Sequence, residues 1–339
     1  MLVAWIGTIG AARKTRLCLT SVCTPDGAPL LVLPLGIENR RGVRVLGFAD
    51  GGVSDYNAPA VLTDRDLTDA MPAIWARIAD ALPGFDIASI DKVPATAGDR
   101  PNPLVALART REFRPGQVVE LSGTWESFAR IGLPRAQDSR RKRRRLAERG
   151  PVAFRVAETP QDKGVVLAAL IEQKRRRYLE TRGFDGLARP GYLDYLNRTV
   201  STPDLTDSIH LSALWCGETI VAAHWGIATP NRYYYLMPSF AGGDWSRYSP
   251  GRLIVEDLIA WCYDKGIRLF DFGHGDEPYK AEFETREVAL YRMDWPRTAL
   301  GHAYAAGLSA RQKLLASPLG PGLRRMKARL SDIARGGRA

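Results

Sequence analysis

Apolar residues in the first third of the chain recur with the periods of strands and of one helix. Helical spacing over 67–82 predicts a helix with one buried side. The apolar face of that helix consists of Met71, Ile74, Trp75, Ile78 and Leu82. The strands that alternation and β-branched content predict around it are 17–22, 30–37, 43–48, 85–90 and 118–121. A short helix is predicted at 125–131 and a basic helix at 135–149.

After residue 150 the pattern predicts longer elements. A strand at 152–157 precedes a long helix over 161–181 and a second helix over 191–200. Turn residues then separate strands at 209–215, 219–228 and 232–237, as in antiparallel hairpins. A helix over 250–265 and strands over 267–272 and 288–294 complete the series. The whole pattern predicts a mixed α/β protein.

The helix predicted over 250–265 begins with Ser249-Pro250-Gly251. Serine is a common N-cap residue, proline suits the first helical position, and glycine lets another group approach the backbone. The amino end of a helix has unpaired N–H groups and a partial positive charge, which favour a phosphate. We therefore expect an anion site here, flanked by Arg247 and Arg252; a capped helix without a ligand is the simpler alternative.

Ionisable side chains crowd the segment that follows the strand over 267–272. Asp271, His274, Asp276, Tyr279 and Lys280 all fall in one turn-rich stretch. We expect Lys280 to bind a phosphate or stabilise an oxyanion, and Tyr279 to protonate a leaving thiolate or donate a hydrogen bond. Asp276 is expected to orient either one. A surface turn with an ordinary ion pair is the alternative.

The strand over 219–228 carries a histidine among small residues. Alternation puts His224 on the face of Ala222 and Gly226, which predicts room for a ligand over the imidazole. Because imidazole titrates near neutral pH, His224 is a candidate general base for an attacking amine. A hydrogen-bonded core histidine is the alternative. Tyr235 in the next strand is a candidate for lining an acceptor groove, although aromatic residues in strands more often pack in a core.

Charge adds two basic segments to this picture. The net charge is +11, yet 135–149 holds eight Lys/Arg against two acids and 311–339 holds eight against one, so the remainder is near neutral. No aromatic residue interrupts Arg140–Arg145, and no nucleic-acid motif surrounds it. A solvated helix face, a CoA phosphate, an acidic glycan, a tRNA and lipid headgroups therefore all remain open as partners of this run.

The apolar spacing over 319–335 predicts an amphipathic basic helix. Docking on the body of the protein, pairing with another copy and binding to an anionic membrane are the three alternatives for this helix. The four cysteines form no CxxC pair, and Cys216 and Cys262 fit buried positions as free thiols, which suits a reducing cytoplasm. The sequence shows neither a metal-ligand cluster nor a nucleophile elbow, so we expect no metal and no covalent intermediate.

These motifs resemble those of the GNAT-fold acyltransferases of the CelD-like group, which was first tied to cellulose and exopolysaccharide biosynthesis and is distantly similar to FemAB-type peptidyltransferases. The similar pieces are Tyr248-Ser249-Pro250-Gly251, the stretch from Asp271 to Lys280, Ala222–Gly226, the arginine-rich run and, more weakly, Leu33-Pro34-Leu35 and Ser54-Asp55-Tyr56. The usual pyrophosphate loop of the fold, Gln/Arg-x-x-Gly-x-Gly/Ala, is not intact. Arg247 and Gly251 stand in for it, with Pro250 between them.

The resemblance implies two tandem GNAT-like domains, the first degenerate. The expected boundaries are a degenerate domain at 1–134, a basic linker helix at 135–150, an acyltransferase domain at 151–300 and a basic tail at 301–339. The resemblance also implies acetyl-CoA or another acyl-CoA as co-substrate, bound by Arg247, Ser249, Pro250, Gly251 and Arg252. In FemAB-type relatives the first domain helps to hold the acceptor, which makes Asp55 and Tyr56 candidates for that task.

The function that follows is direct transfer of an acyl group from acyl-CoA to the amine or hydroxyl of an acceptor such as a sugar, in exopolysaccharide or cell-envelope synthesis. Such a protein is expected in the cytoplasm or at the inner face of the cell membrane. Two alternatives remain: an aminoacyl-tRNA-dependent transferase, which would need Arg140–Arg145, and a non-catalytic scaffold of a membrane polysaccharide synthase, which would not need the polar turn ending at Lys280.

Overall fold

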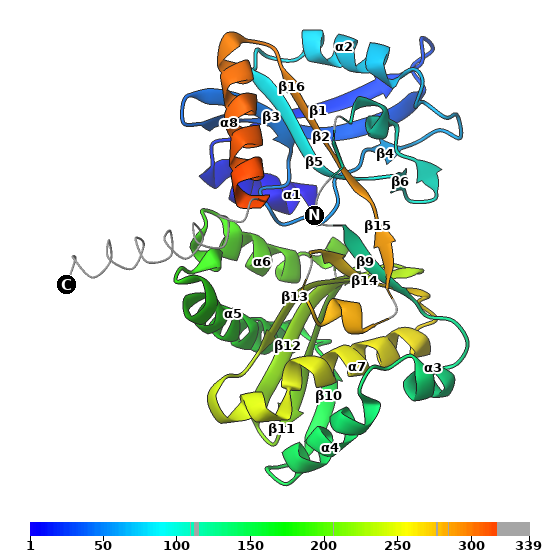
Figure 1. Ribbon diagram of the computed structural model, residues 1–339, viewed down its shortest axis with the longest axis vertical. Helices are drawn as coiled ribbons and strands as arrows, with labels where there is room; N and C mark the ends of the chain where they lie inside the picture. The colour runs from blue at the N-terminus through cyan, green and yellow to red at the C-terminus, as the bar shows by residue number, and fades with distance from the viewer. Residues whose placement is uncertain (109, 112–114, 206, 276, 284, 317–339) are drawn as a thin grey trace, which may run out of the picture. The chain divides into compact units, whose positions relative to one another are not determined.

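The computed structural model describes residues 1–316 except 109, 112–114, 206, 276 and 284 (Figure 1). The chain forms two compact units whose segments alternate along the sequence. Unit 1 contains Met1, 114–180 and 185–288, and unit 2 contains 2–113, 181–184 and the chain from 289 onward. The basic helix predicted over 319–335 lies outside the described residues.

Unit 1 is built on a mixed sheet in the order β10-β11-β12-β13-β14-β9-β15. The strands are β9 (Gly116–Glu120), β10 (Val152–Val156), β11 (Ile209–Cys216), β12 (Thr219–Ala228), β13 (Arg232–Phe240), β14 (Leu269–His274) and β15 (Arg286–Val288). β13 and β14 pair parallel, and the other neighbours pair antiparallel. A parallel pair needs a crossover connection, which α7 (Pro250–Asp264) provides.

Helices cover both faces of the unit 1 sheet (Figure 1). α7 packs its apolar stripe on β11, β12 and β13, and Leu253, Leu258 and Cys262 of that stripe are fully buried. On the other face lie α5 (Pro160–Arg182) and α6 (Tyr192–Ser201). Gln173 of α5 donates to the Ile220 carbonyl over 2.8 Å. α3 (Trp125–Ile131) and α4 (Ala136–Ala147) precede β10, and short turns of 3₁₀ helix occur at 186–188, 203–205, 243–248 and 280–282.

Unit 2 has a second mixed sheet in the order β1-β2-β3-β5-β16-β8, with β4 paired to β2. Its strands are β1 (Arg16–Cys23), β2 (Pro29–Arg40), β3 (Val43–Phe48), β4 (Ala60–Val61), β5 (Ile87–Pro94), β8 (Thr110–Arg111) and β16 (Leu290–Pro296); β6 (Thr96–Ala97) and β7 (Arg100–Pro101) form a small hairpin. α2 (Met71–Ala81) packs on the side of Leu46 and Ala88, whereas α8 (Ala299–Ala316) packs on Val45 and Ile87. The chain begins with α1 (Leu2–Trp5) and a π-helical turn at 6–10, and a 3₁₀ turn spans 103–107.

The two units repeat one topology. In unit 2, antiparallel β2 and β3 lead through α2 to β5, which pairs parallel with β3. In unit 1, antiparallel β12 and β13 lead through α7 to β14, which pairs parallel with β13. The mixed α/β class predicted from the sequence is therefore confirmed, and the repeat agrees with a tandem arrangement.

Two strands belong to a different sheet from the one that the sequence predicts for them. The strand expected over 288–294 in the second domain corresponds to β16, which pairs with β5 of unit 2. β9, expected in the first domain, pairs with β14 of unit 1. Pairing between strands far apart in sequence depends on cross-strand packing, which local periodicity does not contain. The helix α8 was not predicted either.

Candidate functional site

The parallel strands β13 and β14 separate next to a bulge. They pair through 232–234 and 269–271, and the β12–β13 register shifts at Gly226 so that an extra residue of β13 follows Tyr234. A bulge bends its strand, which here turns β13 away from β14. Only glycine fits opposite the bulge, because a Cβ at Gly226 would lie 2.6 Å from the Tyr234 carbonyl oxygen.

A pocket of about 300 Å³ opens beside these strands and reaches the first turn of α7. Its apolar wall is formed by Tyr235, Pro238, Phe240, Pro250, Val255, Tyr279 and Phe283. Its polar wall is formed by Ser246, Ser249, Gly251 and Arg252. The expected anion-binding helix start therefore borders a cavity that is large enough to hold part of a ligand.

The first turn of α7 differs in one detail from the prediction. Pro250 is the first helical residue, as expected, but the Ser249 side chain makes no cap. Ser249 adopts a left-handed conformation with φ 50° and ψ 51°, and its hydroxyl instead accepts a hydrogen bond from Lys142 Nζ at 2.7 Å. The Arg252 and Leu253 amides both donate to the Ser249 carbonyl. The Gly251 amide, in the same turn, does not bond to that carbonyl.

The two arginines predicted to flank this turn differ in position. Arg252 lines the pocket, donates to the Pro134 carbonyl over 2.7 Å and pairs with Glu282. Arg247 is paired with Asp244 at 3.4 Å and does not line the pocket. The structure thus brings Ser249, Pro250, Gly251 and Arg252 together, without Arg247.

Two tyrosines present their rings to the pocket from different elements. Tyr235 follows the bulge of β13, and Tyr279 lies in the turn after β14. Tyr235 is 3% exposed, and its hydroxyl has no hydrogen-bond partner among the residues that the structure describes. Burial, and next the proximity of Tyr279, raise the pKa of Tyr235 well above its usual value. Tyr235 is therefore a neutral O–H donor at physiological pH.

His224 lies one layer behind the pocket. Its ring stacks on Tyr235 with centroids 4.3 Å apart, and its Nδ1 lies 2.9 Å from the Tyr233 hydroxyl. The prediction of a free space over the imidazole is therefore wrong, because the Tyr235 ring fills that space. Burial, followed by His210 and Lys174, lowers the pKa of His224 well below its usual value. The structure does not bring His224 to the pocket.

Buried histidines make unit 1 sensitive to acid, which is a testable property. Burial, and next Lys163, lower the pKa of His210 to about 3, and the pKa of His224 is also lowered. In the unfolded chain both would titrate near pH 6.5. Below that pH the unfolded state binds protons that the folded state does not, so stability present above pH 6.5 is lost as the pH falls. We expect a loss of about 1.4 kcal/mol per pH unit for each histidine.

Urea denaturation between pH 7 and pH 5 measures this slope. His210→Gln should remove about half of it, whereas His302→Gln, at an exposed position of α8, should leave it unchanged. An unchanged slope in His210→Gln would show that the buried imidazole is not the source of the acid sensitivity.

Lys280 has its own partners next to the pocket. It is 4% exposed, forms an ion pair with Glu277 at 2.8 Å and donates to the His274 carbonyl over 3.4 Å. Its neighbour Tyr279 lines the pocket, but Lys280 does not. Asp276, the third residue predicted in this turn, lies outside the described residues.

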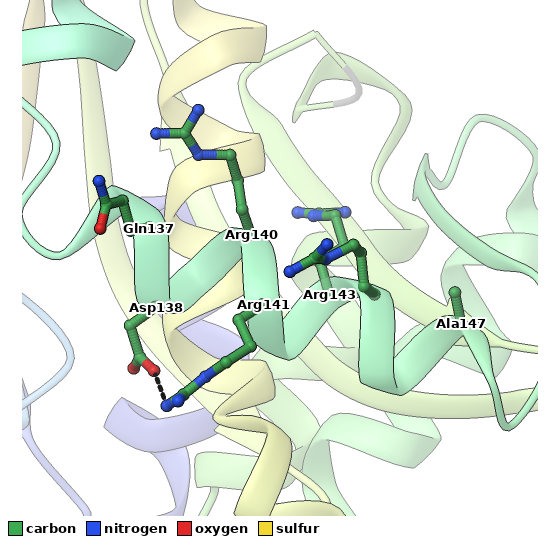
Figure 2. Close-up of a pocket in the computed structure, with 7 residues that line it drawn as sticks. Gln137, Asp138, Arg140, Arg141, Arg143 and Ala147 are labelled. Atoms are coloured by element: carbon green, nitrogen blue, oxygen red, sulfur yellow. Dashed lines mark hydrogen bonds and ion pairs between the residues drawn. The ribbon is translucent and has the colours of Figure 1, made fainter.

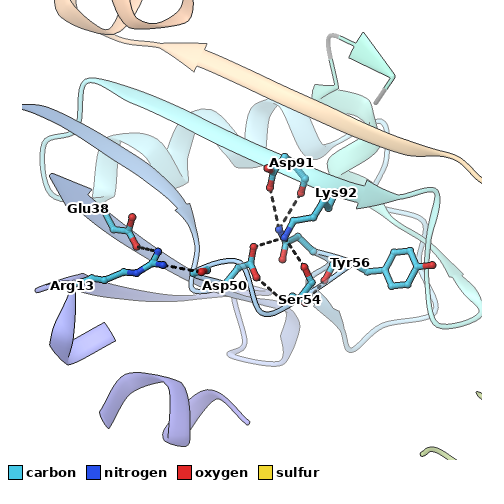
Figure 3. Close-up of polar contacts among 9 residues, drawn as sticks. Arg13, Glu38, Asp50, Ser54, Tyr56, Asp91 and Lys92 are labelled. Carbon is cyan, nitrogen blue, oxygen red and sulfur yellow. Dashed lines mark hydrogen bonds and ion pairs between the residues drawn. The ribbon is translucent and has the colours of Figure 1, made fainter. Parts of the chain in front are cut away.

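Asp55 and Tyr56 belong to a loop of unit 2 that is fixed by a partly buried lysine, Lys92. Lys92 Nζ donates to Asp50 over 2.5 Å and to the Ser54 carbonyl over 2.6 Å (Figure 3). Burial alone would lower the pKa of Lys92. The nearby carboxylates of Asp50, Asp91 and Asp55 together have a larger effect, so the pKa of Lys92 is raised. Figure 3 shows the Tyr56 ring directed away from this cluster. The structure describes this loop within unit 2, separately from the pocket of unit 1.

Four arginines of the basic run are exposed on the outward side of α4: Arg140, Arg141, Arg144 and Arg145. Figure 2 shows Arg140 and Arg141 extending from this helix, with Arg141 paired to Asp138 at 2.6 Å. An open groove follows them, lined by Gln137, Asp138, Arg140, Arg141, Arg143, Arg144 and Ala147. The predicted helix is confirmed, and several of its cations face a solvent-filled groove.

Two further properties bear on chemistry. Among the described residues, no three His, Cys, Asp or Glu side chains gather into a group that would hold a metal ion. In the same part of the chain, no helix is both long and apolar enough to cross a bilayer.

Solved structures of similar fold span both units. FemX matches with a TM-score of 0.55 and 11% identity, covering 87% of this chain and 95% of that one. The C-terminal domain of a putative lysylphosphatidylglycerol synthetase from Agrobacterium fabrum matches with a TM-score of 0.53 and 13% identity, covering 92% and 91%. L-PGS from Bacillus licheniformis matches with a TM-score of 0.50 and 14% identity, covering 88% and 92%. At such identities the likeness establishes the fold.

Sequence comparison identifies the domain that contains the pocket. No curated protein sequence matches the chain. A family model described as an acetyltransferase (GNAT) domain matches residues 135–281, from the start of α4 through the turn that holds Tyr279. The resemblance to the CelD-like group rests on the sequence motifs alone. The chain contains a GNAT-fold acetyltransferase domain, and the matched residues fall almost entirely within unit 1.

Proposed function

We propose that this protein transfers an acyl group from acetyl-CoA or another acyl-CoA to an amine or hydroxyl acceptor, with the acyl donor bound in the pocket at α7. One observation carries the proposal: the pocket joins a helix amino end to Tyr235, whose hydroxyl has no hydrogen-bond partner among the described residues. A hydroxyl that faces a largely apolar pocket without a protein partner is available to a bound ligand. The match to an acetyltransferase domain supports the same conclusion.

The two walls of the pocket suit the two ends of such a donor. The diphosphate would lie against the Gly251 amide, the Ser249 hydroxyl and Arg252, where the helix dipole favours negative charge. The uncharged arm and its thioester would lie against the apolar wall, which includes Phe240 and Val255. A Cβ at Gly251 would be 3.0 Å from the Phe240 ring, so glycine permits this close packing.

The chemistry requires an oxyanion donor and a proton donor. The acceptor nitrogen or oxygen attacks the thioester carbonyl carbon, and Tyr235 O–H donates to the oxygen that gains negative charge. When the C–S bond breaks, Tyr279 gives its proton to the leaving thiolate, and its phenolate then takes the proton released by the acceptor. Proton and charge balance without a metal or a covalent enzyme intermediate. We assign no step to His224, because Tyr235 separates it from the pocket.

The acceptor follows from the sequence resemblance alone. We propose a sugar or amine of an exopolysaccharide or cell-envelope precursor. The predicted contacts of Asp55 and Tyr56 with this acceptor, and the association of the basic segments with an anionic membrane, are part of the same proposal. Lys280 and Asp276 remain proposed members of the site.

A second candidate is transfer from an aminoacyl-tRNA. Two observations favour it: the fold likeness to FemX and to the lysylphosphatidylglycerol synthetases, and the arginine groove on α4 (Figure 2). Guanidinium groups bind phosphates through paired N–H groups, which suits a nucleic-acid backbone. This candidate predicts that activity needs charged tRNA and falls when Arg140–Arg145 are neutralised.

Isothermal titration calorimetry with acetyl-CoA, longer acyl-CoAs and free CoA separates the candidates. We expect saturable heat with a CoA thioester and competition by free CoA. Absence of heat with every CoA species, together with transfer from aminoacyl-tRNA, would overturn the proposal in favour of the second candidate. Absence of binding and transfer with both donors would support the non-catalytic scaffold.

A further inference from the structure

We propose that Lys142 of α4 binds the diphosphate of the acyl donor and supplies the positive charge that a complete pyrophosphate loop would supply by its backbone. This inference rests on the proposed function, because it concerns the same pocket. Lys142 lies outside the motif at 247–252 and belongs to a helix more than 100 residues earlier in the chain. It was not among the residues predicted to bind the donor.

α4 is held against the first turns of α7 by its inward face. The Ser139 hydroxyl donates to Glu256 over 2.5 Å, and Arg143 pairs with Asp257 at 2.7 Å. Leu146 on the same face is fully buried. Three contacts along the helix therefore fix its position, and a side chain on this face has a defined location relative to the pocket.

Lys142 extends from this fixed face to the edge of the pocket. Its ammonium donates to Ser249 over 2.7 Å and pairs with Asp138 at 3.0 Å, and these are its polar partners within the described chain. An ammonium group has three N–H donors, so one remains for a phosphate oxygen. The Lys142 side chain is 24% exposed, which leaves this donor accessible from solvent.

The other cations near α7 are less suited to this task. The guanidinium of Arg252 is engaged by the Pro134 carbonyl and by Glu282. Arg247 pairs with Asp244 and does not line the pocket. Arg140 and Arg141 extend from the outward side of α4 (Figure 2). Lys142 is thus the α4 cation that directly contacts a residue of the pocket wall.

The strained backbone at Ser249 supports a functional contact. A non-glycine residue in the left-handed region is strained and persists where the surroundings require it. In this conformation the hydroxyl points to Lys142 instead of capping the α7 amides. The unpartnered Tyr235 hydroxyl is an independent sign that this cavity receives a ligand.

Lys142→Met tests the inference, because it keeps the length of the side chain and removes the charge. Each variant is assayed with acetyl-CoA and with the acetyl thioester of N-acetylcysteamine, which has the same reacting group but no diphosphate. We expect the KM for acetyl-CoA to rise about tenfold or more in Lys142→Met, as for the loss of a charge-assisted hydrogen bond. The kcat/KM for the short thioester should stay unchanged.

Two further variants separate charge from structure. Lys265→Met makes the same change at the opposite end of α7, and its KM for acetyl-CoA should equal that of the wild type. Ser249→Ala removes the internal hydrogen bond but keeps the Lys142 charge, so it should affect acetyl-CoA less than Lys142→Met does.

An unchanged KM for acetyl-CoA in Lys142→Met would overturn the inference. So would an equal loss with both thioesters, which would reveal a structural role. A wild-type chain that neither binds nor uses any CoA thioester would instead refute the proposed function, and the role of Lys142 with it.

Discussion

Replacing Tyr235 by phenylalanine should lower kcat by roughly 10²–10³-fold and leave the melting temperature unchanged. The hydroxyl has no protein partner within the described residues, so its removal breaks no internal hydrogen bond. The ring, with its contacts to His224 and Phe270, is retained. Steady-state kinetics with the acyl donor, combined with thermal unfolding, measures both quantities in one variant.

Tyr233 provides a matched control from the same strand. Its hydroxyl bonds to His224 Nδ1 at 2.9 Å, and it does not line the pocket. Tyr233→Phe should therefore cost about 1–3 kcal/mol of stability, because a fully buried nitrogen loses its partner, while turnover stays near that of the wild type. If Tyr235→Phe turned over normally, or if Tyr233→Phe were the slower enzyme, the oxyanion role of Tyr235 would be wrong.

A carboxylate at Gly251 should abolish tight donor binding and, compared with an uncharged side chain of the same size, should not weaken the helix. In Gly251→Asp a negative charge lies in the first turn of α7, where it interacts favourably with the helix dipole by about 0.3–1 kcal/mol. The same charge repels a diphosphate about 5 Å away by roughly 3 kcal/mol at an effective dielectric constant of about 20, which corresponds to about a hundredfold in affinity. Relative to Gly251→Asn, the stability of Gly251→Asp should thus rise slightly while its donor affinity falls.

Gly251→Asn controls for shape, because it brings a side chain of the same size against the Phe240 ring without the charge. The comparison uses the Kd for acyl-CoA from calorimetry and the midpoint of urea unfolding for each variant. Equal affinities of the Asp and Asn variants would place the diphosphate away from the amino end of α7.

Local periodicity predicted the elements that build the pocket. The start of α7 at Pro250 follows from its proline, and the bounds of β12 follow from an uninterrupted strand pattern. The placement of Tyr233 and Tyr235 on the face that packs under α7 follows from alternation. These features depend on neighbours in sequence, which the chain itself displays.

The contacts that complete the site depend on residues far apart in sequence. The space over His224 is filled from the neighbouring strand, after a bulge that no local pattern reveals. The Ser249 hydroxyl bonds to a lysine of α4 instead of capping its own helix. Lys280, favoured by its place in a polar turn, is buried and has an ion pair with Glu277 that only the folded chain shows. Such contacts are set by tertiary packing, which overrides local preferences.

The alternation of the two units along the chain has a consequence for synthesis on the ribosome. Unit 2 receives β16 and α8 from residues after 289, and β16 lies between β5 and β8 in its sheet. The N-terminal unit therefore cannot complete its sheet until the whole of the later unit has emerged. Until then β5 has an open edge, which is the kind of surface that chaperones cover and that aggregation exploits. When the emerged part of a nascent chain ends at residue 288, it should thus contain a finished unit 1 and an unfinished unit 2.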